Sequence, residues 1–299
     1  MSVPAEPGRR RPVAAVFDRA ADRYDEVEPR VFTPLGAQLV AGSGRRLGAD
    51  VLDVAAGKGA VYLAAALGAR RAVAVDIAPA MLTRLDWLAR RQGLPAPELH
   101  VMDAESLAFR GGSFDAVFCG FGLSFCPRPD RALAEFRRVL RPGGVVAVSA
   151  WDAAEDPRWT WLVHLAGPRS EAAMARELAG GAALAGALST AGFADVEVER
   201  HAVDVRYTDA ANWLRWSWSH GFRALLERLS PDGLERLAQL AGPRVEATRE
   251  GDGLCHRRLT ALFGYGRADV WRSSSRGADP AVRRRRYGDD RPVARPVVA

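Results

Sequence analysis

The pattern of apolar residues predicts an α/β fold built on a doubly wound, mostly parallel sheet of seven strands. Short apolar runs alternate with helical stretches through the first half of the chain, which is typical of a parallel sheet covered by helices on both faces. The runs follow one another at roughly 20–30 residues, which suits right-handed crossover connections. The fold is therefore expected to be Rossmann-like, with helical lid insertions.

Five strands are expected in the first half of the chain. A helical region over 13–41 comes first, and Thr33 followed by Pro34 is a good start signal within it. The expected strands cover 51–55, 72–76, 98–102, 114–120 and 145–151, and the helices cover 60–68, 79–92 and 130–140. The segment LRPGG at 140–144 is expected to separate the last of these helices from the fifth strand.

The second half of the chain adds two strands and two helical insertions. Residues 156–192 are rich in alanine and predicted to be helical, and residues 195–207 alternate as a strand does. A helical block rich in Trp and Leu covers 209–247, and 253–267 form the last strand. One domain is thus expected over 13–271, with lid insertions at about 156–192 and 209–247.

Both ends of the chain are predicted to be disordered tails. Residues 1–12 and 272–299 are rich in Pro, Gly, Arg and Asp and show no hydrophobic periodicity. The net charge of +6 lies in these tails, with +2 over residues 1–12 and +5 over residues 272–299. Because the interior is nearly neutral, a nucleic-acid partner is not expected.

Metal sites, disulfides and membrane spans are also not expected. Cys119, Cys126 and Cys255 lack metal-binding spacing and do not make an even disulfide set. The five histidines are scattered. No signal peptide opens the chain, and no apolar run approaches the ~20 residues that span a bilayer. We expect a cytoplasmic protein and leave open whether it forms a homo-oligomer.

The segment VLDVAAGKGAVYLAA at 51–65 runs from an apolar strand through a turn of small residues into a helix. A phosphate-binding loop needs G-x-x-x-x-G-K-[ST], but Leu52 and Gly59 stand at its first and last positions. A dinucleotide-binding turn needs G-x-G-x-x-G, and Tyr62 stands where its third glycine would be. Lys58, the only lysine of the chain, is predicted to matter less than its small neighbours, which let a ligand approach the backbone.

Three aspartates stand at or near the carboxyl ends of consecutive expected strands. Asp53 lies within the first strand, Asp76 closes the second and Asp103 closes the third. Open α/β sheets bind ligands in the crevice at these strand ends. One such aspartate is more often a cap or turn residue, but three in register favour a ligand site. Asp76 lies 19 residues after Gly57, about where an acid meets ribose hydroxyls.

Five segments of the chain together resemble the class I S-adenosylmethionine-dependent methyltransferases. They are, in order, VLDVAAGKG, AVAVDIAPAML, VMDAESLAF, FDAVFCGFGLSF and ALAEFRRVLRPGG. The resemblance is to the branch that includes the ubiquinone and menaquinone C-methyltransferases and many small-molecule tailoring enzymes. It covers about residues 13–207 and the last strand. Each segment is a weak signal alone, whereas five in order at the right strand ends are specific.

The resemblance implies a site for S-adenosylmethionine and assigns residues to its methionine and ribose parts. Asp76 would accept hydrogen bonds from both ribose hydroxyls. The family usually has glycine where this chain has Ala55, whose methyl group is tolerable if the backbone φ there is negative. The methionine end would be held by Asp53 and by the backbone of the turn at Ala55, Ala56, Gly57 and Gly59.

The same resemblance implies the contacts of the adenine ring. Ile77 and Met81 would pack against it. Asp103 and the amide of Ala104 would recognise its polar edge.

The path to the transferable methyl group would be lined by Gly120 and Phe121, which end the fourth expected strand. Tyr24 belongs to FDRAADRYDEV at 17–27, which resembles the family's amino-terminal helix. Two interpretations stay open for it: the ring closes over the cofactor, or it simply packs its own helix.

One helical stretch of the second insertion, 212–226, is unusually aromatic. Trp213, Trp216 and His220 fall at i, i+3 and i+7 and so share one helix face. The functional hypothesis is a substrate-binding wall formed by both tryptophans, with His220 as the catalytic base or an orienting group. The alternative is a lid helix packed by its tryptophans, with His220 as a cap. His164 is the second choice for the base.

The sequence thus favours an enzyme that transfers a methyl group from S-adenosylmethionine, without a metal, to a small hydrophobic or aromatic acceptor of secondary-metabolite or quinone type. Such a displacement mainly needs alignment and the exclusion of water. Whether carbon, oxygen or nitrogen is methylated is left open. Two other functions are kept: an NAD(P)-dependent oxidoreductase, which Tyr62 disfavours, and a non-catalytic binding or regulatory protein on the same fold.

Overall fold

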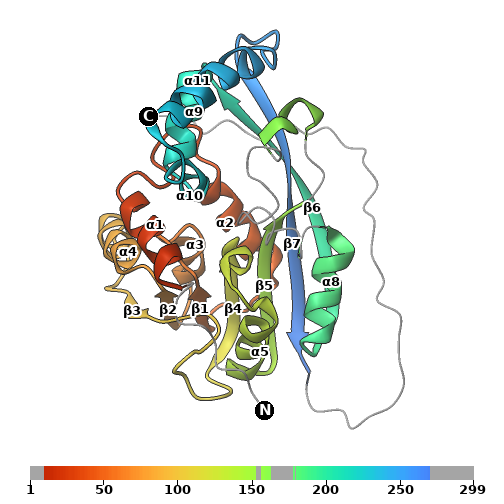
Figure 1. Ribbon diagram of the computed structural model, residues 1–299. Coiled ribbons are helices and arrows are strands. Elements are labelled where there is room, and N and C mark those ends of the chain that lie inside the picture. The colour runs from red at the N-terminus through yellow and green to blue at the C-terminus, as the bar shows by residue number, and fades with distance from the viewer. Residues whose placement is uncertain (1–9, 153–155, 163–177, 179, 270–299) are drawn as a thin grey trace, which may run out of the picture.

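The computed structural model describes residues 10–152, 156–162, 178 and 180–269, and Figure 1 shows them arranged around one twisted sheet. The strands are β1 Asp50–Val54, β2 Arg71–Asp76, β3 Glu98–Val101, β4 Phe114–Gly120, β5 Leu140–Trp151, β6 Phe193–Tyr207 and β7 Cys255–Ala268. The α-helices include α1 Arg10–Ala20, α2 Phe32–Gly42, α3 Tyr62–Ala66, α4 Pro79–Arg91, α5 Pro129–Val139, α8 Gly181–Thr190, α9 Ala210–Trp218, α10 Arg223–Leu226 and α11 Pro231–Glu246.

The seven strands lie in the order β3-β2-β1-β4-β5-β7-β6. The first five strands pair in parallel. β7 pairs antiparallel with both β5 and β6, so only this end of the sheet is mixed. The predicted fold class, a doubly wound and mostly parallel α/β sheet of seven strands, is confirmed.

Successive residues of β1 point to two separate cores on the two faces of the sheet. Val51 packs in one core with Leu35 and Leu39 of α2, and Leu52 packs in the other with Phe136 of α5. This alternation follows from the two-residue period of a strand. All of β1 is buried, as expected for a strand covered by helices on both faces.

The strand order reverses between β1 and β4, because β2 and β3 lie on one side of β1 and the later strands on the other. In open α/β sheets the carboxyl ends at such a reversal leave a crevice. The chain that follows β1 and β4 therefore borders the position where a ligand is expected.

The amino-terminal region differs from the prediction. The helix expected over 13–41 is two helices, α1 and α2, separated by turns over 21–31. α1 begins at Arg10, so the last residues of the tail predicted over 1–12 are helical. α2 begins at Phe32 rather than after Thr33, because the Thr33 hydroxyl and amide bind the carboxylate of Asp25 and do not cap the helix themselves.

The segment at 140–144 was expected to separate helix from strand, but β5 already begins at Leu140. Leu140 pairs with Phe114, and the next pair joins Val145 to Ala116. The residues between them form a bulge in the strand, and Gly143 supplies a φ of +79° there. The expected break is therefore an irregularity within the strand.

The two insertions are described to different extents. Of the first, the structure describes a short 3₁₀ turn, Pro157–Trp159, and α8, while His164 lies outside the described residues. The second insertion forms α9, α10 and α11, which lie together at the upper end of the long β6–β7 pair in Figure 1. The tails predicted to be disordered lie almost wholly outside the described residues.

The helices of the described residues differ from transmembrane helices. None of them combines the length and the apolar character that crossing a bilayer requires.

Candidate functional site

Two adjoining cavities open at the carboxyl ends of the central strands. We call the first the turn cavity, because the turn after β1 forms much of its wall; its lining includes Asp25, Phe32, Thr33, Asp53, Ala56, Lys58 and Ser149. We call the second the strand-end cavity; its lining includes Phe17, Asp76, Ile77, Met81, Met102, Asp103, Ala104, Gly122 and Phe125. Both are lined by Tyr24, Ala55, Gly57, Gly120 and Phe121, so they meet there.

Asp53 carries a buried carboxyl group. Its side chain is 1% exposed and neither oxygen makes a hydrogen bond of good geometry within the described residues. Burial raises the pKa of Asp53 well above its usual value, and the Tyr62 amide that faces it offsets only part of this effect. A buried carboxyl group with so little hydrogen bonding costs stability, which makes Asp53 a candidate ligand-binding residue.

Asp76 connects the end of β2 to the turn after β1. One carboxylate oxygen accepts a hydrogen bond from the Gly57 amide at 2.7 Å, and the other accepts from the Ala78 amide at 2.8 Å. Burial raises the pKa of Asp76 to about 6 although both amides oppose this. Gly57 has a φ of +54°, and a Cβ atom there would meet nothing within 4 Å, so its backbone faces open space.

Ala55 adopts a left-handed backbone conformation with a φ of +55°. The condition stated above for tolerating its methyl group, a negative φ, is therefore not met. The left-handed region costs a residue with a Cβ roughly 1–2 kcal/mol. Space for the methyl group comes from Gly122, because a Cβ atom at Gly122 would lie 2.4 Å from the Cβ of Ala55.

Gly59 and Tyr62 face the inside of the fold rather than the cavities. A Cβ atom on Gly59, whose φ is +95°, would lie 2.9 Å from Leu85 of α4, and Gly59 lines neither cavity. Tyr62 is buried and packs with Leu85 and Ala74. Gly59 thus allows α4 to approach the turn, and Tyr62 fills the helix–strand interface where a dinucleotide-binding fold needs glycine.

The strand-end cavity has apolar walls and one polar edge. Met81 of α4 is buried beside Ile77, and Met102 lines the same cavity. Asp103 turns the chain after β3, where one of its oxygens accepts from the Glu105 amide at 2.8 Å. The structure brings the four residues predicted to surround the adenine ring, Ile77, Met81, Asp103 and Ala104, onto one cavity.

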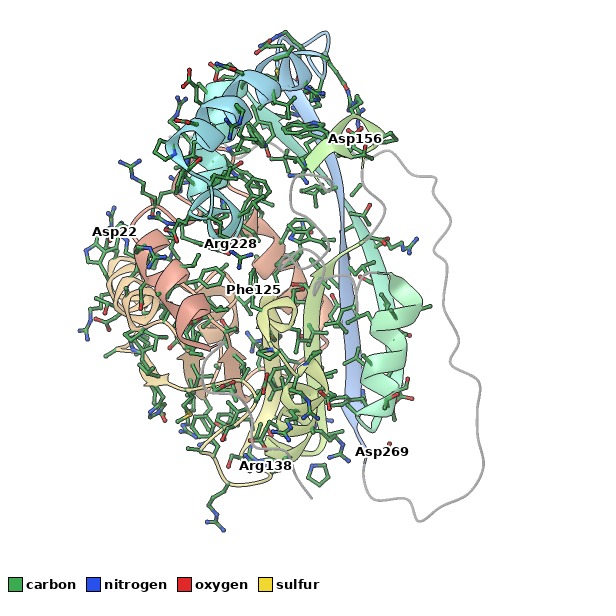
Figure 2. All side chains as sticks on the ribbon, viewed as in Figure 1. Asp22, Phe125, Arg138, Asp156, Arg228 and Asp269 are labelled. Carbon is green, nitrogen blue, oxygen red and sulfur yellow. The ribbon has the colours of Figure 1, made fainter. Side chains whose placement is uncertain are left out.

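Aromatic rings cover the junction of the two cavities. Tyr24 stacks on Phe32 with ring centroids 5.4 Å apart, and Phe121 stacks on Trp151 at 4.6 Å. Phe32 meets Phe121 edge to face at 5.4 Å. Phe125, labelled near the centre of Figure 2, continues this surface towards α1. These rings therefore form one aromatic wall beside the junction.

Lys58 contributes more than the sequence interpretation allowed. Its side chain is 8% exposed and forms an ion pair with Glu26, which is 33% exposed. The neighbouring Asp25 accepts hydrogen bonds from the amides of Val31 and Phe32. The turn after β1 is thus tied to the segment between α1 and α2. Asp25 and Glu26 directly follow Tyr24 in the chain. The single lysine of the sequence was the signal that could have indicated the ion pair.

Two further contacts hold α1 over the strand-end cavity. Asp18 accepts a hydrogen bond from the Ala80 amide at 2.9 Å, at the first turn of α4. Arg19 forms an ion pair with Glu227, which follows α10. The amino-terminal segment therefore closes the site from the side opposite to the sheet.

The two tryptophans predicted to bind substrate do not line either cavity. Trp213 is buried with Trp161 and Trp159, whose ring centroids lie 5.5 and 6.1 Å from its own. The indole nitrogen of Trp216 donates to the Pro29 carbonyl at 2.9 Å. Both rings instead fix α9 to its neighbours, through ring packing and the hydrogen bond to Pro29.

His220 follows the end of α9 and stands behind the cavity wall. Its ring centroid lies 4.3 Å from that of Trp216, 5.1 Å from Phe32 and 5.2 Å from Tyr24. Among the residues that line the two cavities, Phe32 and Tyr24 separate it from the open space. The structure therefore does not bring His220 onto the surface that a ligand would touch.

His220 is held in one neutral form. Its Nδ1 lies 2.7 Å from the Trp216 carbonyl oxygen, which can only accept, so Nδ1 carries the proton. Nε2 is buried and has no hydrogen-bond partner within the described residues. Burial lowers the pKa of His220 to about 4, so the ring is uncharged at neutral pH.

In the part of the chain that the structure describes, no three His, Cys, Asp or Glu side chains lie together in a way that could hold a metal ion.

Comparison with known proteins gives consistent matches. Residues 52–148 match a family model described as a methyltransferase domain. The chain is 30% identical over 237 residues to nocamycin O-methyltransferase of Saccharothrix syringae, covering 73% of this chain and 85% of that protein. It is 35% identical over 144 residues to aklanonic acid methyltransferase DauC of Streptomyces sp. strain C5, covering 47% of this chain and 66% of that protein. The YcgJ protein of Bacillus subtilis shares the fold, with a TM-score of 0.57, 20% identity, and coverage of 80% and 100%.

The sheet order and the acids at its strand ends define a doubly wound α/β protein with a crevice where the strand order reverses. Together with the matched domain and the relative that is covered over most of its length, they identify the family. The chain belongs to the class I S-adenosylmethionine-dependent methyltransferases. Neither named methyltransferase among these relatives is a ubiquinone or menaquinone C-methyltransferase.

Proposed function

We propose that the chain transfers the methyl group of S-adenosylmethionine to an oxygen atom of a small, mainly apolar molecule of secondary-metabolite or quinone type. The observation that carries this proposal is the junction of the two cavities at Gly120 and Phe121, where polar strand ends meet an aromatic wall. Transfer to oxygen is supported by nocamycin O-methyltransferase, the relative covered over 85% of its length.

The residues present fit the cofactor. Asp53 would receive the ammonium group of the methionine end, which supplies the donors that its buried oxygens lack. The backbone from Ala55 to Gly57 would approach the same end, since Gly57 faces open space. Asp76 would accept from the ribose hydroxyls, and its present amide contacts keep the carboxylate oriented. When bound, the cofactor supplies a methyl group on a positively charged sulfur, ready for in-line displacement.

The strand-end cavity would hold the adenine ring. Ile77 and Met81 would bury its faces, and Asp103 with the amide of Ala104 would bind its polar edge. The stacked rings of Tyr24 and Phe32 would exclude water from the reacting centre. Holding two reactants aligned in this way supplies roughly 7–11 kcal/mol of a barrier.

The acceptor is proposed to be an acidic hydroxyl, such as a phenol or an enol. Of the described side chains on the two cavity walls, Lys58 is engaged by Glu26, and Asp25 already accepts from backbone amides. Asp53, Asp76 and Asp103 would be engaged by the cofactor, and His220 stands behind the wall. Because no strong base faces the junction among these residues, an acceptor that ionises readily near neutral pH suits the site.

Calorimetry with S-adenosylhomocysteine and NADH tests the cofactor assignment. We expect micromolar binding of the first and none of the second. Asp53→Asn should weaken S-adenosylhomocysteine binding by more than tenfold with little change in the melting temperature, because burial already disfavours the charged carboxylate in the folded protein. Mass spectrometry after incubation with S-adenosylmethionine and either a hydroxyanthraquinone or a naphthol tests the transfer. Binding of NADH alone would refute the proposal.

A further inference from the structure

Strained backbone gathers at the cavities. Four non-glycine residues of the described part of the chain have φ between +49° and +58°, and three of them, Asp25, Ala55 and Phe121, line a cavity. Such conformations persist only where the surroundings hold them, and they concentrate at functional sites. Phe121 is the bulkiest of the three and borders both cavities.

Glycines on both sides leave Phe121 as the only side chain that extends from the end of β4. A Cβ atom at Gly120 would lie 2.8 Å from a methyl group of Val61, and one at Gly122 would lie 2.4 Å from the Cβ of Ala55. The backbone of this segment therefore packs closely against Ala55 in the turn after β1 and against Val61, which precedes α3. This packing holds the segment close to the turn after β1.

The hydroxyl group of Ser149 also constrains the backbone at Phe121. The Phe121 amide donates a hydrogen bond to the Oγ of Ser149 at 3.0 Å. Ser149 is 1% exposed and sits in β5, which pairs with β4 through the register Gly120–Ser149. With this amide satisfied, the Phe121 ring lies flat on Trp151, with an interplanar angle of 28°. No sequence motif indicates Ser149.

We propose that Ser149 is a positioning residue for methyl transfer. Its hydroxyl holds Phe121 in the left-handed conformation, and the Phe121 ring then sets the shape of the junction at which the acceptor meets the methyl group. The role of Ser149 in methyl transfer rests on the function proposed above, whereas its hold on Phe121 does not. Loss of the hydroxyl leaves a buried amide without a partner, so the peptide at Phe121 rotates and the ring leaves Trp151.

The matched variants are Ser149→Ala, Ser149→Thr and Phe121→Gly. In Ser149→Ala we expect S-adenosylhomocysteine affinity within threefold of wild type, and transfer to the hydroxyanthraquinone slowed at least tenfold in kcat. Ser149→Thr, which keeps the hydroxyl, should restore most of kcat. In the Phe121→Gly background the same Ser149→Ala change should have less than a twofold effect, because glycine adopts a positive φ unaided. A role in packing alone would give the same effect in both backgrounds.

A crystal structure of Ser149→Ala with S-adenosylhomocysteine gives a readout that needs no acceptor. We expect a changed φ at Phe121 and a ring displaced from Trp151. If Phe121 keeps its conformation, the inference is overturned even where the enzyme transfers methyl groups as proposed. If wild type methylates neither probe while the ring moves as expected, the acceptor class is wrong and the positioning contact stands. Thermal unfolding of each variant identifies any that fails to fold. If Ser149→Ala is such a variant, Phe121→Gly tests instead whether kcat depends on the ring.

Discussion

Lys58 and Glu26 form an ion pair that joins the turn after β1 to the segment between α1 and α2. The lysine is nearly buried, and burial lowers its pKa while the glutamate raises it. The pair thus connects the proposed methionine end of the cofactor site with the aromatic cover that begins at Tyr24. The ion pair therefore holds the segment that carries Tyr24 in place against the turn after β1.

Removing one partner of this ion pair should lower the free energy of unfolding more than removing both partners. Glu26→Gln leaves a buried ammonium group without its acid and should cost roughly 2 kcal/mol, below the range for fully buried pairs because Glu26 is 33% exposed. The double variant Glu26→Gln with Lys58→Met should recover about half of this loss. Denaturant unfolding measures both. Equal losses in the single and the double variant would show that the pair carries no coupling.

The affinity for S-adenosylhomocysteine should fall in acid through Asp76. Burial raises its pKa to about 6, and a carboxylate that accepts from hydroxyls must be ionised. Affinity should therefore be constant above about pH 7 and fall by up to tenfold per pH unit below about 6. Calorimetry between pH 5 and 8 measures this. Asp76→Asn is the control and should bind weakly with a flatter profile; an unchanged slope there would assign the titration to another group.

Ala55 and Gly122 should behave as a coupled pair. Ala55→Gly removes a left-handed alanine and should leave stability unchanged or raise it by about 1 kcal/mol. Gly122→Ala should destabilise by more than 2 kcal/mol, because the two Cβ atoms would lie 2.4 Å apart. The double variant Ala55→Gly with Gly122→Ala should regain much of that loss. Thermal unfolding of all four proteins tests this, and strictly additive changes would contradict it.

His220 should contribute to the pH dependence of stability. Its pKa is about 4 in the folded protein and about 6.5 unfolded, so the unfolded state binds more protons between these values. The stabilisation is thus complete above pH 6.5 and is lost as the pH falls through 4, by up to roughly 3 kcal/mol. Urea unfolding of wild type and His220→Gln from pH 4 to 8 measures the difference, which also separates this titration from that of Asp76.

Turnover tests the hypothesis that His220 is the catalytic base. Because its ring stands behind Phe32 and Tyr24, His220→Gln should lower kcat by less than tenfold. A loss of 100-fold or more with normal binding of S-adenosylhomocysteine would instead establish a direct role as base.

Most strands could be predicted from local pattern. The apolar runs of β1, β2 and β4 agree with the structure to within one residue, because a strand buried on both faces is mainly apolar. The helix ends were less accurate. Asp25 determines where α2 begins by binding amides seven and eight residues away along the chain, and no local pattern shows this contact.

The acids of the site were visible in the sequence because they occupy fixed places relative to strands. The positions of Asp53, Asp76 and Asp103 could be inferred because each lies at or near the carboxyl end of an expected strand, where open α/β sheets bind ligands. The aromatic stripe of Trp213, Trp216 and His220 gave a weaker inference. Helical spacing shows that side chains share a face, but it does not show whether that face meets a cavity or another helix.

The sequence by itself determined the α/β fold, the position of the turn after β1 and the three acids that border it, since these depend on periodicity and on the residue types at strand ends. Only the tertiary structure decided the left-handed φ of Ala55, the partner of Lys58 and the hydroxyl of Ser149 beneath Phe121. Each of these depends on contacts between segments that are distant in the chain, where small differences in packing select one backbone conformation over another.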